Sequence, residues 1–504
     1  MPQASYNKIV PAQFFQYFSV LPANPIFALM RFPIFFLSIT LLLLVAQSGC
    51  RKDPLEEDSS ARLEFSTDTI VFDTVFTTVG SSTRQFKVYN RGRKAVNISS
   101  IKLAGATNSN FHLNIDGVPS ISVSDILLRG GDSMYVFVDV QVDPNNSNSP
   151  LMIEDSVQFE TNGNRQHVVL NAVGQDAYFH FNTYLSCNEV WTNDKPHVIY
   201  GYAVIPQCCM LTLMPGTRVY LHKNSTLAAD SCSTLKVLGA QGNPVTFQGD
   251  RLEADYADEP GQWNFIWLST QSINNVIDYA VIKNGSIGVL CDSTVAASPN
   301  PAVKITNTRI MNMSLAGIYG RDSWIEGDNV AISNCAQYCV AIAYGGKCKF
   351  RHCSFGDYWN IDSRTTPCVL LNNWYEIDDL TNNYRDLLQA DFLNCIIDGP
   401  IENELGLDSN AASPTQFNYF FQNCLIKTNI NTTSTAQIPH FQNCLINQNT
   451  SFVNPEGNNL HINLISAAKD FGDLVIGNQV QFDLDGVPRM NDIAPDAGAY
   501  EYVP

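Results

Sequence analysis

The chain has 504 residues, a formal net charge of −18 and a pI of about 4.7, and charged residues make up only 15% of it. This acidic balance provides no basic stripe for phosphates and so excludes nucleic acid as a partner. The length is too great for one small core and predicts two or three domains.

The first predicted element is an export signal in residues 1–50. Arg31 precedes the apolar stretch 32–45, which is short for a membrane span, and small residues follow up to Gly49 and Cys50. This order is typical of a cleaved signal. Met30 would give a signal of normal length, so residues 1–29 can be an over-extended start. An uncleaved membrane anchor is the alternative.

Gly49-Cys50 resembles a bacterial lipobox, which implies lipidation of Cys50. The resemblance implies an exported lipoprotein of Bacteroidetes type, anchored in the membrane through its acyl chains. We expect it in the outer membrane, facing the periplasm or the cell surface, with residues 51–62 as a polar tether.

Short runs of alternating apolar and polar residues fill residues 63–177. Examples are 86–89, 135–140 and 157–159, with Gly and Asn between them. Short strands with evenly spaced turns predict an all-β sandwich.

Particular residues of this stretch follow the pattern of a known domain family. They are Val88-Tyr-Asn90-Arg-Gly92, the run 132–138 and the closing run 155–163. The stretch resembles the immunoglobulin-like domains of the abnormal-spindle/hydin type. That resemblance implies a binding or spacer module rather than a catalytic one.

Three near-copies of one phrase predict stacked coils. They are Phe392-Leu-Asn-Cys395-Ile-Ile, Phe421-Gln-Asn-Cys424-Leu-Ile and Phe441-Gln-Asn-Cys444-Leu-Ile, and looser copies place the central residue at 280, 308, 335 and 353. Coils of roughly 20–30 residues are typical of solenoids, in which like residues stack over like. We expect a junction at 178–196 and then a right-handed parallel β-helix with a C-terminal closing segment over 197–504. An antiparallel sandwich is the alternative.

Both ends of that region resemble segments of exported bacterial β-helix proteins with a pectate-lyase-like solenoid. The opening coils contain Pro215-Gly216 and run from 212 to 247, and the closing segment runs from Asp483 to Glu501. The fold implied by this resemblance is specific, but its function is not, because the fold supports lyases, hydrolases, adhesins and spacers.

The cysteine count constrains the chemistry. Of 14 cysteines, Cys50 is reserved for lipidation, and the remaining odd number cannot all pair in an oxidising compartment. We expect most of them to fill the core as small apolar side chains. Cys208-Cys209 and the run Cys335, Cys339, Cys348 and Cys353 can include a disulfide, but the run lacks the paired spacing typical of zinc sites. We therefore expect no metal site there.

An acidic insert before Trp263 is the first candidate site. It contains Asp250, Arg251 and Glu253, and its carboxylates can bind Ca²⁺ or act on a sugar that stacks on Trp263. A structural loop, with Arg251 paired to an acid and Trp263 as a packing anchor, is the alternative. Beyond this Ca²⁺ we expect no cofactor.

The second candidate site follows Trp374 and Tyr375. Asp378 and Asp379 are adjacent acids, and glycosidases use a carboxyl pair as acid and base. Trp324, Trp359, Trp374 and Tyr375 can form a carbohydrate platform if they share a face, or they can seal the corners of coils.

Two functions compete. The first is a non-catalytic envelope lipoprotein that binds a glycan or an envelope protein or serves as a structural component. The second is a polysaccharide lyase or glycosidase that uses Asp250, Glu253, Asp378 and Asp379. The absence of a convincing catalytic constellation favours the first.

Overall fold

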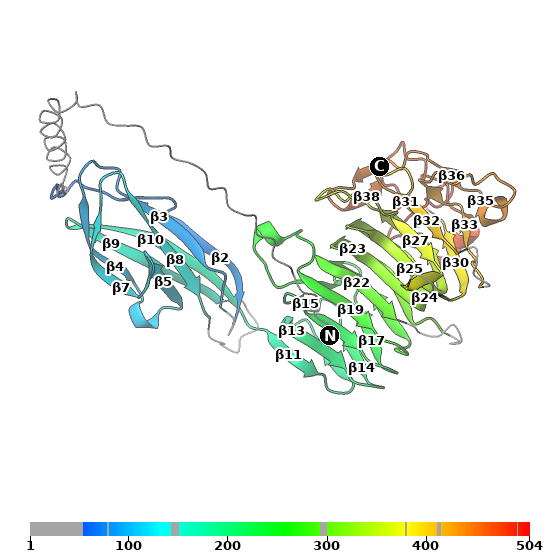
Figure 1. Cartoon of the computed structure of the whole chain (residues 1–504), viewed down its shortest axis with the longest axis horizontal. Helices are drawn as coiled ribbons and strands as arrows, with labels where there is room; N and C mark the ends of the chain where they lie inside the picture. Colours follow the sequence, from blue (N-terminus) through cyan, green and yellow to red (C-terminus); the bar gives the residue numbers. More distant parts are fainter. Residues whose placement is uncertain are drawn as a thin grey trace, which may run out of the picture.

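The computed structural model describes residues 54–77, 80–142, 151–292, 300–378, 381–410, 415–490 and 492–504 (Figure 1). Nearly all regular structure in these ranges is β, as predicted, and it forms two bodies joined end to end. Among the described residues no helix is both long and apolar enough to cross a membrane. Cys50 lies outside the described residues.

Two five-stranded sheets make up the N-terminal body, drawn in blue and cyan in Figure 1. They pack face to face over a core that includes Phe72, Phe86 and Phe159, because alternate residues of each strand point inward. The first sheet comprises β1 (Glu64–Phe65), β3 (Arg84–Tyr89), β8 (Ser133–Val140), β5 (Phe111–Ile115) and β6 (Val118–Pro119). The second comprises β2 (Thr69–Phe76), β10 (Asn164–Gln175), β9 (Leu151–Thr161), β4 (Val96–Leu103) and β7 (Ser122–Leu128).

The second body is a parallel solenoid. Its 24 strands form one continuous sheet in which a strand pairs mainly with the third strand after it, so each coil presents three faces. Strands pair in parallel throughout this sheet, for example β14 with β17 and β15 with β18. The parallel coil predicted from the repeated phrase is therefore confirmed, and its handedness stays a prediction.

The strands divide among three faces. The first face has β12 (Glu189–Trp191), β14 (Met210–Leu213), β17 (Thr234–Leu238), β20 (Asn275–Asp278), β30 (Leu387–Leu393), β33 (Phe420–Gln422) and β35 (Phe441–Gln442). The second face has β15 (Arg218–Leu221), β18 (Val245–Gly249), β21 (Ala280–Lys283), β26 (Ser354–Gly356), β31 (Ile396–Asp398), β34 (Leu425–Ile426) and β36 (Leu445–Ile446). The third face has β16 (Thr226–Ala229), β19 (Trp263–Leu268), β22 (Gly285–Asp292), β27 (Val369–Asn372) and β32 (Leu405–Asp408).

Five longer strands turn corners and serve more than one face. They are β11 (Tyr178–Tyr184), β13 (His197–Ile205), β23 (Val303–Met313), β24 (Ala316–Cys335) and β25 (Tyr338–Arg351). Because β11 and β12 pair with β13 and β14, the solenoid begins at Tyr178. The expected junction at 178–196 is therefore corrected, since these residues form the first coil.

The repeated phrase marks the corner between the first and second faces. Phe392 and Cys395 point into the core, and Asn394 between them has a φ of 55°, a left-handed conformation that Asn adopts more readily than other non-glycine residues. Asn423 and Asn443 repeat it with φ of 49° and 50°. In each copy of the phrase, the Asn therefore turns the chain at a corner of the coil, and the Phe before it and the Cys after it fill the core.

Strand pairing shows that one predicted member of the repeat, Cys335, lies at a different corner of the coil. Val330 pairs with Thr308, and Ala331 after it pairs with Ser354, so the residue that stacks with Cys353 is Val330. Cys335 instead pairs with Met313, one corner further along the chain. Asn334 has a φ of 52° at that second corner, so two different corners of one coil use the same Asn-turn chemistry.

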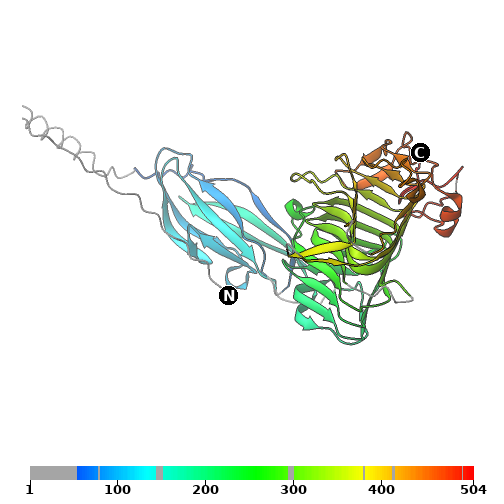
Figure 2. The same cartoon turned by 45° about the vertical axis from the view of Figure 1, so that its right-hand side comes forward.

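The C-terminal segment does not add coils, as expected of a closing segment, but it begins after β36 and so earlier than the expected Asp483. The last strand of the solenoid sheet is β36, and the chain then forms the hairpin β37 (Phe452–Asn454) with β38 (Asn459–Ile462) and the helix α2 (Leu474–Gln479). It packs across the outer side of the second face, where Ile396 and Leu425 contact Ala468 and Ala497. Figure 2 shows this segment, in orange and red, beside the upper coils.

Short elements complete the inventory. The hairpin β28 (Trp374–Asp378) with β29 (Thr381–Tyr384) projects after β27. Single 3₁₀ turns occur at η1 (Ala106–Asn108), η2 (Ala254–Tyr256) and η3 (Ile438–His440).

Candidate functional site

A groove of about 730 Å³ on the third face combines aromatic and charged side chains. It crosses four neighbouring coils, because β22, β24, β25 and β27 stack in parallel there. The lining residues are Thr270, Asp292, Tyr319, Arg321, Ala343, Tyr344, Leu370, Asn372, Trp374 and Tyr375.

Register places the groove's residues in two outward columns. Tyr319 pairs with Ala341, which pairs with Leu370. In the second column Arg321 pairs with Asp292 on one side and with Ala343 on the other. Small side chains at Ala341 and Ala343 therefore lie between larger ones, which hollows the face along the solenoid axis.

A fixed ion pair forms one wall. Arg321 donates two hydrogen bonds to Asp292, Nε to Oδ1 at 2.5 Å and Nη2 to Oδ2 at 2.7 Å, and Trp267 Nε1 donates to Oδ2 at 2.8 Å. The hydrogen bonds to Asp292 raise the pKa of the Arg321 guanidinium. Bidentate geometry of this kind is stronger than a simple surface pair. The wall therefore presents an oriented guanidinium plane.

The projecting hairpin forms the opposite wall. The ring of Tyr375 packs edge-on against Tyr344, with centroids 4.5 Å apart, and 46% of Tyr375 is exposed. Trp374 Nε1 donates to Asp408 Oδ1 at 3.0 Å, and Asn372 Nδ2 donates to Asp408 Oδ2 at 2.7 Å. Asp408 thus orients two of the groove's side chains.

A cation lies behind this wall. Arg385 stacks over Tyr344 at 4.9 Å and lies 3.5 Å from a carboxylate oxygen of Asp322. Burial raises the pKa of Asp322 despite this partner. The aromatic wall is therefore supported from behind by charge rather than left loose.

The acidic insert lies elsewhere, between the two bodies. His222 Nδ1 is 2.7 Å from Asp250 Oδ2, and Tyr200 donates its hydroxyl to the same oxygen at 3.3 Å. Burial, followed by the charge of Asp250, raises the pKa of Tyr200. These groups line a cleft of about 130 Å³ together with residues 72–76 and 80–82 of the sandwich.

Arg251 and Glu253 close that cleft. Burial opposes ionisation of Glu253, but hydrogen bonds from Arg251, from its own backbone and from Ser82 outweigh it and hold the pKa of Glu253 at about 2. The Ser82 hydroxyl donates a hydrogen bond to a carboxylate oxygen of Glu253 at 2.8 Å rather than to the imidazole of His222. Ser82 therefore lacks the histidine partner that would activate its hydroxyl as a nucleophile. The ring of Phe76 also packs on Tyr220 at 5.0 Å. The cleft therefore joins the bodies, and Arg251 pairs with an acid as the structural interpretation expected.

The aromatic residues predicted to bind carbohydrate do not share one surface. Trp263 is 1% exposed and donates Nε1 to Lys283 O at 2.9 Å, so its ring is a packing anchor that no sugar can reach. Trp359 is 8% exposed and lines a separate hollow of about 450 Å³ beside Asn312 and Asn334. Only Trp374 and Tyr375 reach the groove.

The remaining candidates are not brought together with them. Asp250 and Glu253 are not groove residues, Asp379 lies outside the described residues, and the side chain of Asp378 is not described. Sequence reasoning missed Asp292, Arg321 and Tyr319. A signal existed in their spacing, because Arg321 follows Asp292 by 29 residues, close to one coil.

No protein-family model matches the chain, and no curated protein matches it. Among solved structures, the chain is similar to the ASH/PapD-like domain of human CEP192, with 11% identity over 26% of this chain and 96% of that chain and a TM-score of 0.18. It is also similar to the catalytic unit of a thermostable GH87 α-1,3-glucanase from Streptomyces thermodiastaticus, with 11% identity over 68% of this chain and 72% of that chain and a TM-score of 0.32. Similarities this weak carry no argument about activity.

Proposed function

We propose that the protein is a cell-envelope lipoprotein whose third face binds an extended glycan without cleaving it. The groove carries this proposal, because it runs across several coils and combines an exposed ring at Tyr375 with an oriented guanidinium at Arg321. Ligand sites typically pair apolar or aromatic walls with a few fixed polar groups. A pyranose offers the matching surfaces, an apolar ring face and a rim of hydroxyls.

Binding is favoured over cleavage by how the acids are used. Asp292 accepts hydrogen bonds from Arg321 and Trp267, and Asp408 accepts them from Asn372 and Trp374. Glycoside cleavage needs one protonated carboxyl and one free carboxylate on either side of the bond. Both acids are instead held as hydrogen-bond acceptors for neighbouring side chains, which suits a rigid binding surface. A polysaccharide lyase or glycosidase is the competing function.

Anchoring through Cys50 in the outer membrane is part of the proposal. The signal and lipobox pattern supports it, and the disulfides Cys187–Cys209 and Cys208–Cys232 support passage through an oxidising compartment. Globomycin treatment of cells should leave the precursor uncleaved, and mass spectrometry of mature protein should find an acylated Cys50. A mature chain that starts elsewhere would contradict the anchor.

A glycan array with residues 51–504 tests the groove. We expect Tyr375→Ala to weaken binding of any hit about tenfold, equivalent to about 1.4 kcal/mol. Tyr184→Ala is the matched control, because Tyr184 is 65% exposed on β11, outside the groove. Equal affinities of the two variants would contradict the assignment of the groove.

A product assay on each hit separates binding from cleavage. Reducing ends or unsaturated products that disappear in Asp292→Asn or Asp408→Asn would establish the enzyme instead. Binding with no products supports the proposal.

A further inference from the structure

Three potential metal ligands meet inside the solenoid. The Sγ atoms of Cys339 and Cys368 and a carboxylate oxygen of Asp357 all lie within 4.8 Å of one another. Each of these residues is 0% exposed. Cys339 N–H donates to Cys368 O at 2.8 Å, so the two thiols sit on directly adjacent coils. Asp357 follows β26 and enters the cluster from another face of the solenoid.

One oxygen of Asp357 lacks a hydrogen bond. Oδ1 accepts from the N–H of Cys335 at 3.0 Å, but Oδ2 has no hydrogen-bond partner. Its nearest cation is Arg364, whose Nε lies 3.6 Å away and also makes no hydrogen bond. A buried carboxylate oxygen without a partner is costly, which makes it an unexplained feature of this core.

The charge of Arg364 is already matched. Its Nη1 and Nη2 bind the two oxygens of Glu404 at 2.9 and 2.8 Å. Glu404 and Arg364 therefore form a bidentate pair, and Asp357 lies beside the same guanidinium at 3.6 Å, so two buried carboxylates share one cation.

We propose that Cys339, Cys368 and Asp357 bind a thiophilic divalent cation, with zinc as the best match. Zinc takes thiolate and carboxylate ligands together in tetrahedral sites. Each thiol loses its proton to solvent as its Zn–S bond forms, and Asp357 Oδ2 supplies the third ligand. The fourth position is left for a further donor. The proposal is independent of the glycan groove.

The contrast with the other buried thiols supports this choice. Cys353, Cys395, Cys424 and the half-buried Cys444 form a column whose Sγ atoms donate to backbone carbonyls, as Cys339 Sγ does to Ile332 O at 3.4 Å. The difference is that no carboxylate joins the column in a three-ligand group within the described part of the chain. A soft cation needs compensating negative charge as well as sulfur. Among the described residues, Cys339 and Cys368 are where thiols and a carboxylate come together in this way.

Metal content of the full chain is the first test. The chain is expressed without a histidine tag in zinc-supplemented medium, purified in detergent without chelators, and analysed by inductively coupled plasma mass spectrometry. We expect about one zinc per chain, reduced at least tenfold in Cys368→Ala, with Cys348→Ala unchanged. Cys348 is the control because it is a buried thiol on the same strand, β25, outside the cluster.

Cobalt keeps the test decisive if the Cys368 variant does not fold. Wild-type protein grown with Co²⁺ should show near-ultraviolet thiolate-to-cobalt charge transfer, which Asp357→Asn should shift and Cys348→Ala should leave intact. Wild-type protein with less than about a tenth of a metal per chain would overturn the proposal. So would a Cys339–Cys368 disulfide found by peptide mapping, or metal that survives loss of Cys368.

Discussion

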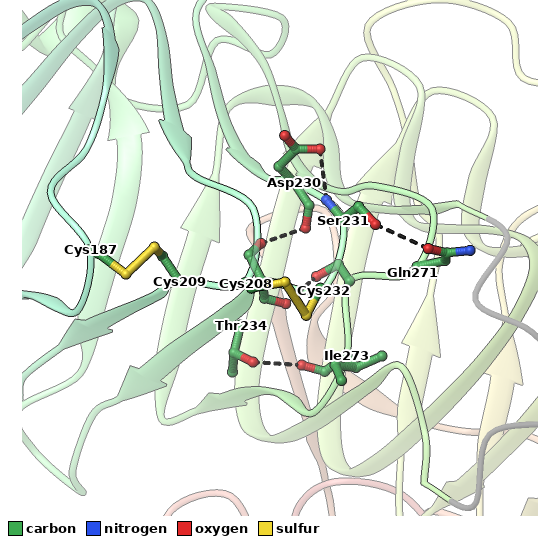
Figure 3. The surroundings of a disulfide bond; sticks show 11 residues. Cys187, Cys208, Cys209, Asp230, Ser231, Cys232, Thr234, Gln271 and Ile273 are labelled. Carbon is green, nitrogen blue, oxygen red and sulfur yellow. Dashed lines mark hydrogen bonds between the residues drawn. A yellow bond between two sulfur atoms is a disulfide. The ribbon is translucent and has the colours of Figure 1, made fainter.

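The early and late coils of the solenoid use cysteine in opposite ways. In the early coils Cys209 is bonded to Cys187 and Cys208 to Cys232, so two disulfides link consecutive turns (Figure 3). In the late coils Cys395 and Cys424 are free and fully buried. The disulfide cysteines stand at exposed turns, where Cys208 and Cys232 adopt positive φ, whereas the free ones point inward.

This difference teaches where a parallel coil needs reinforcement. Inside the late coils, the rings of Phe350, Phe392, Phe421 and Phe441 stack in one column, with neighbouring centroids 5.0–5.3 Å apart. Such a column resists separation of coils through buried apolar area. The early core combines Leu, Val and Ile with separate large rings such as Trp191 and Phe247 instead of a continuous phenylalanine column, and it lies at an edge whose first strand has a neighbour on one side only. In the early coils the two disulfides hold neighbouring turns together, as the column of phenylalanine rings does in the late coils.

Removing a ring from the column should have the largest effect. We expect Phe392→Ala to lower the free energy of unfolding by about 3–5 kcal/mol, because the side chain is fully buried between two rings. Urea denaturation measures the loss, and hydrogen exchange shows whether it falls on the late coils. Phe181→Ala is the control, since Phe181 is 59% exposed. A loss below about 1 kcal/mol would remove the column as the stabilising feature.

Breaking a disulfide should weaken the other end. Replacing Cys187 and Cys209 by Ser opens a loop with a sequence separation of 22, which should cost about 3 kcal/mol. Hydrogen exchange should show faster opening of β11 to β17, and a reductant should have the same effect on wild-type protein. Equal acceleration in β30 to β35 would contradict the division between the two ends.

Acid should also weaken the early coils. His197 stacks on Trp191 at 4.1 Å, and burial holds its pKa at about 3, with His180 adding in the same direction. The folded state therefore keeps His197 neutral while the unfolded chain binds a proton below about pH 6.5. Stability is complete above that pH and is lost as the pH falls toward 3, by about 2 kcal/mol at pH 5.

Urea denaturation at pH 7.5 and pH 5 measures this loss. His197→Phe should flatten the dependence, because it removes the titrating group while keeping a ring against Trp191. An unchanged slope in that variant would show that other groups carry the acid sensitivity.

The smallest effect is expected at the corner of the last coil. Asn443 has a φ of 50° and is exposed, so Asn443→Ala should cost about 1 kcal/mol through backbone conformation alone. Asn443→Gly should be within a few tenths of wild type, because glycine adopts this conformation without a steric penalty. Equal destabilisation by both substitutions in thermal melts would mean that the side chain, rather than the backbone, is needed.

The repeated phrase was enough to predict the parallel coil, because each copy carries its own corner and core residues. It could not assign every corner. Asn334-Cys335 matches the phrase locally, yet it occupies another corner, which the pairing of Cys335 with Met313 reveals. The closing segment was predicted from Asp483 to Glu501, but its earlier start and its packing across Ile396 depend on contacts between distant residues that no local pattern shows.

Only some of the groove's residues could be predicted from the sequence, because the others are recognisable only once the strands are paired. Trp374 and Tyr375 are conspicuous as neighbouring aromatics, but Asp292 and Arg321 look like ordinary surface residues until β22 and β24 are paired. Trp263 was a candidate binding residue, but its ring is buried. An aromatic beside acids can equally fill the core, and Gly285 leaves space for the Trp263 ring. The sequence pattern identifies residue types, and register decides which of them share a surface.

The C-terminal segment is synthesised last, and the solubility of the folded chain depends on it. Asp485 O accepts a hydrogen bond from Gln241, and the hydroxyl of Tyr500 accepts one from Arg309, across 244 and 191 residues of sequence. Contacts between such distant residues close long loops, which makes them slow to form. Until the final residues reach the compartment where the chain folds, the outer apolar column at Ile396 and Leu425 has no cover. A prematurely terminated chain would therefore expose an adhesive stripe, which makes completeness of translation a condition for escaping aggregation.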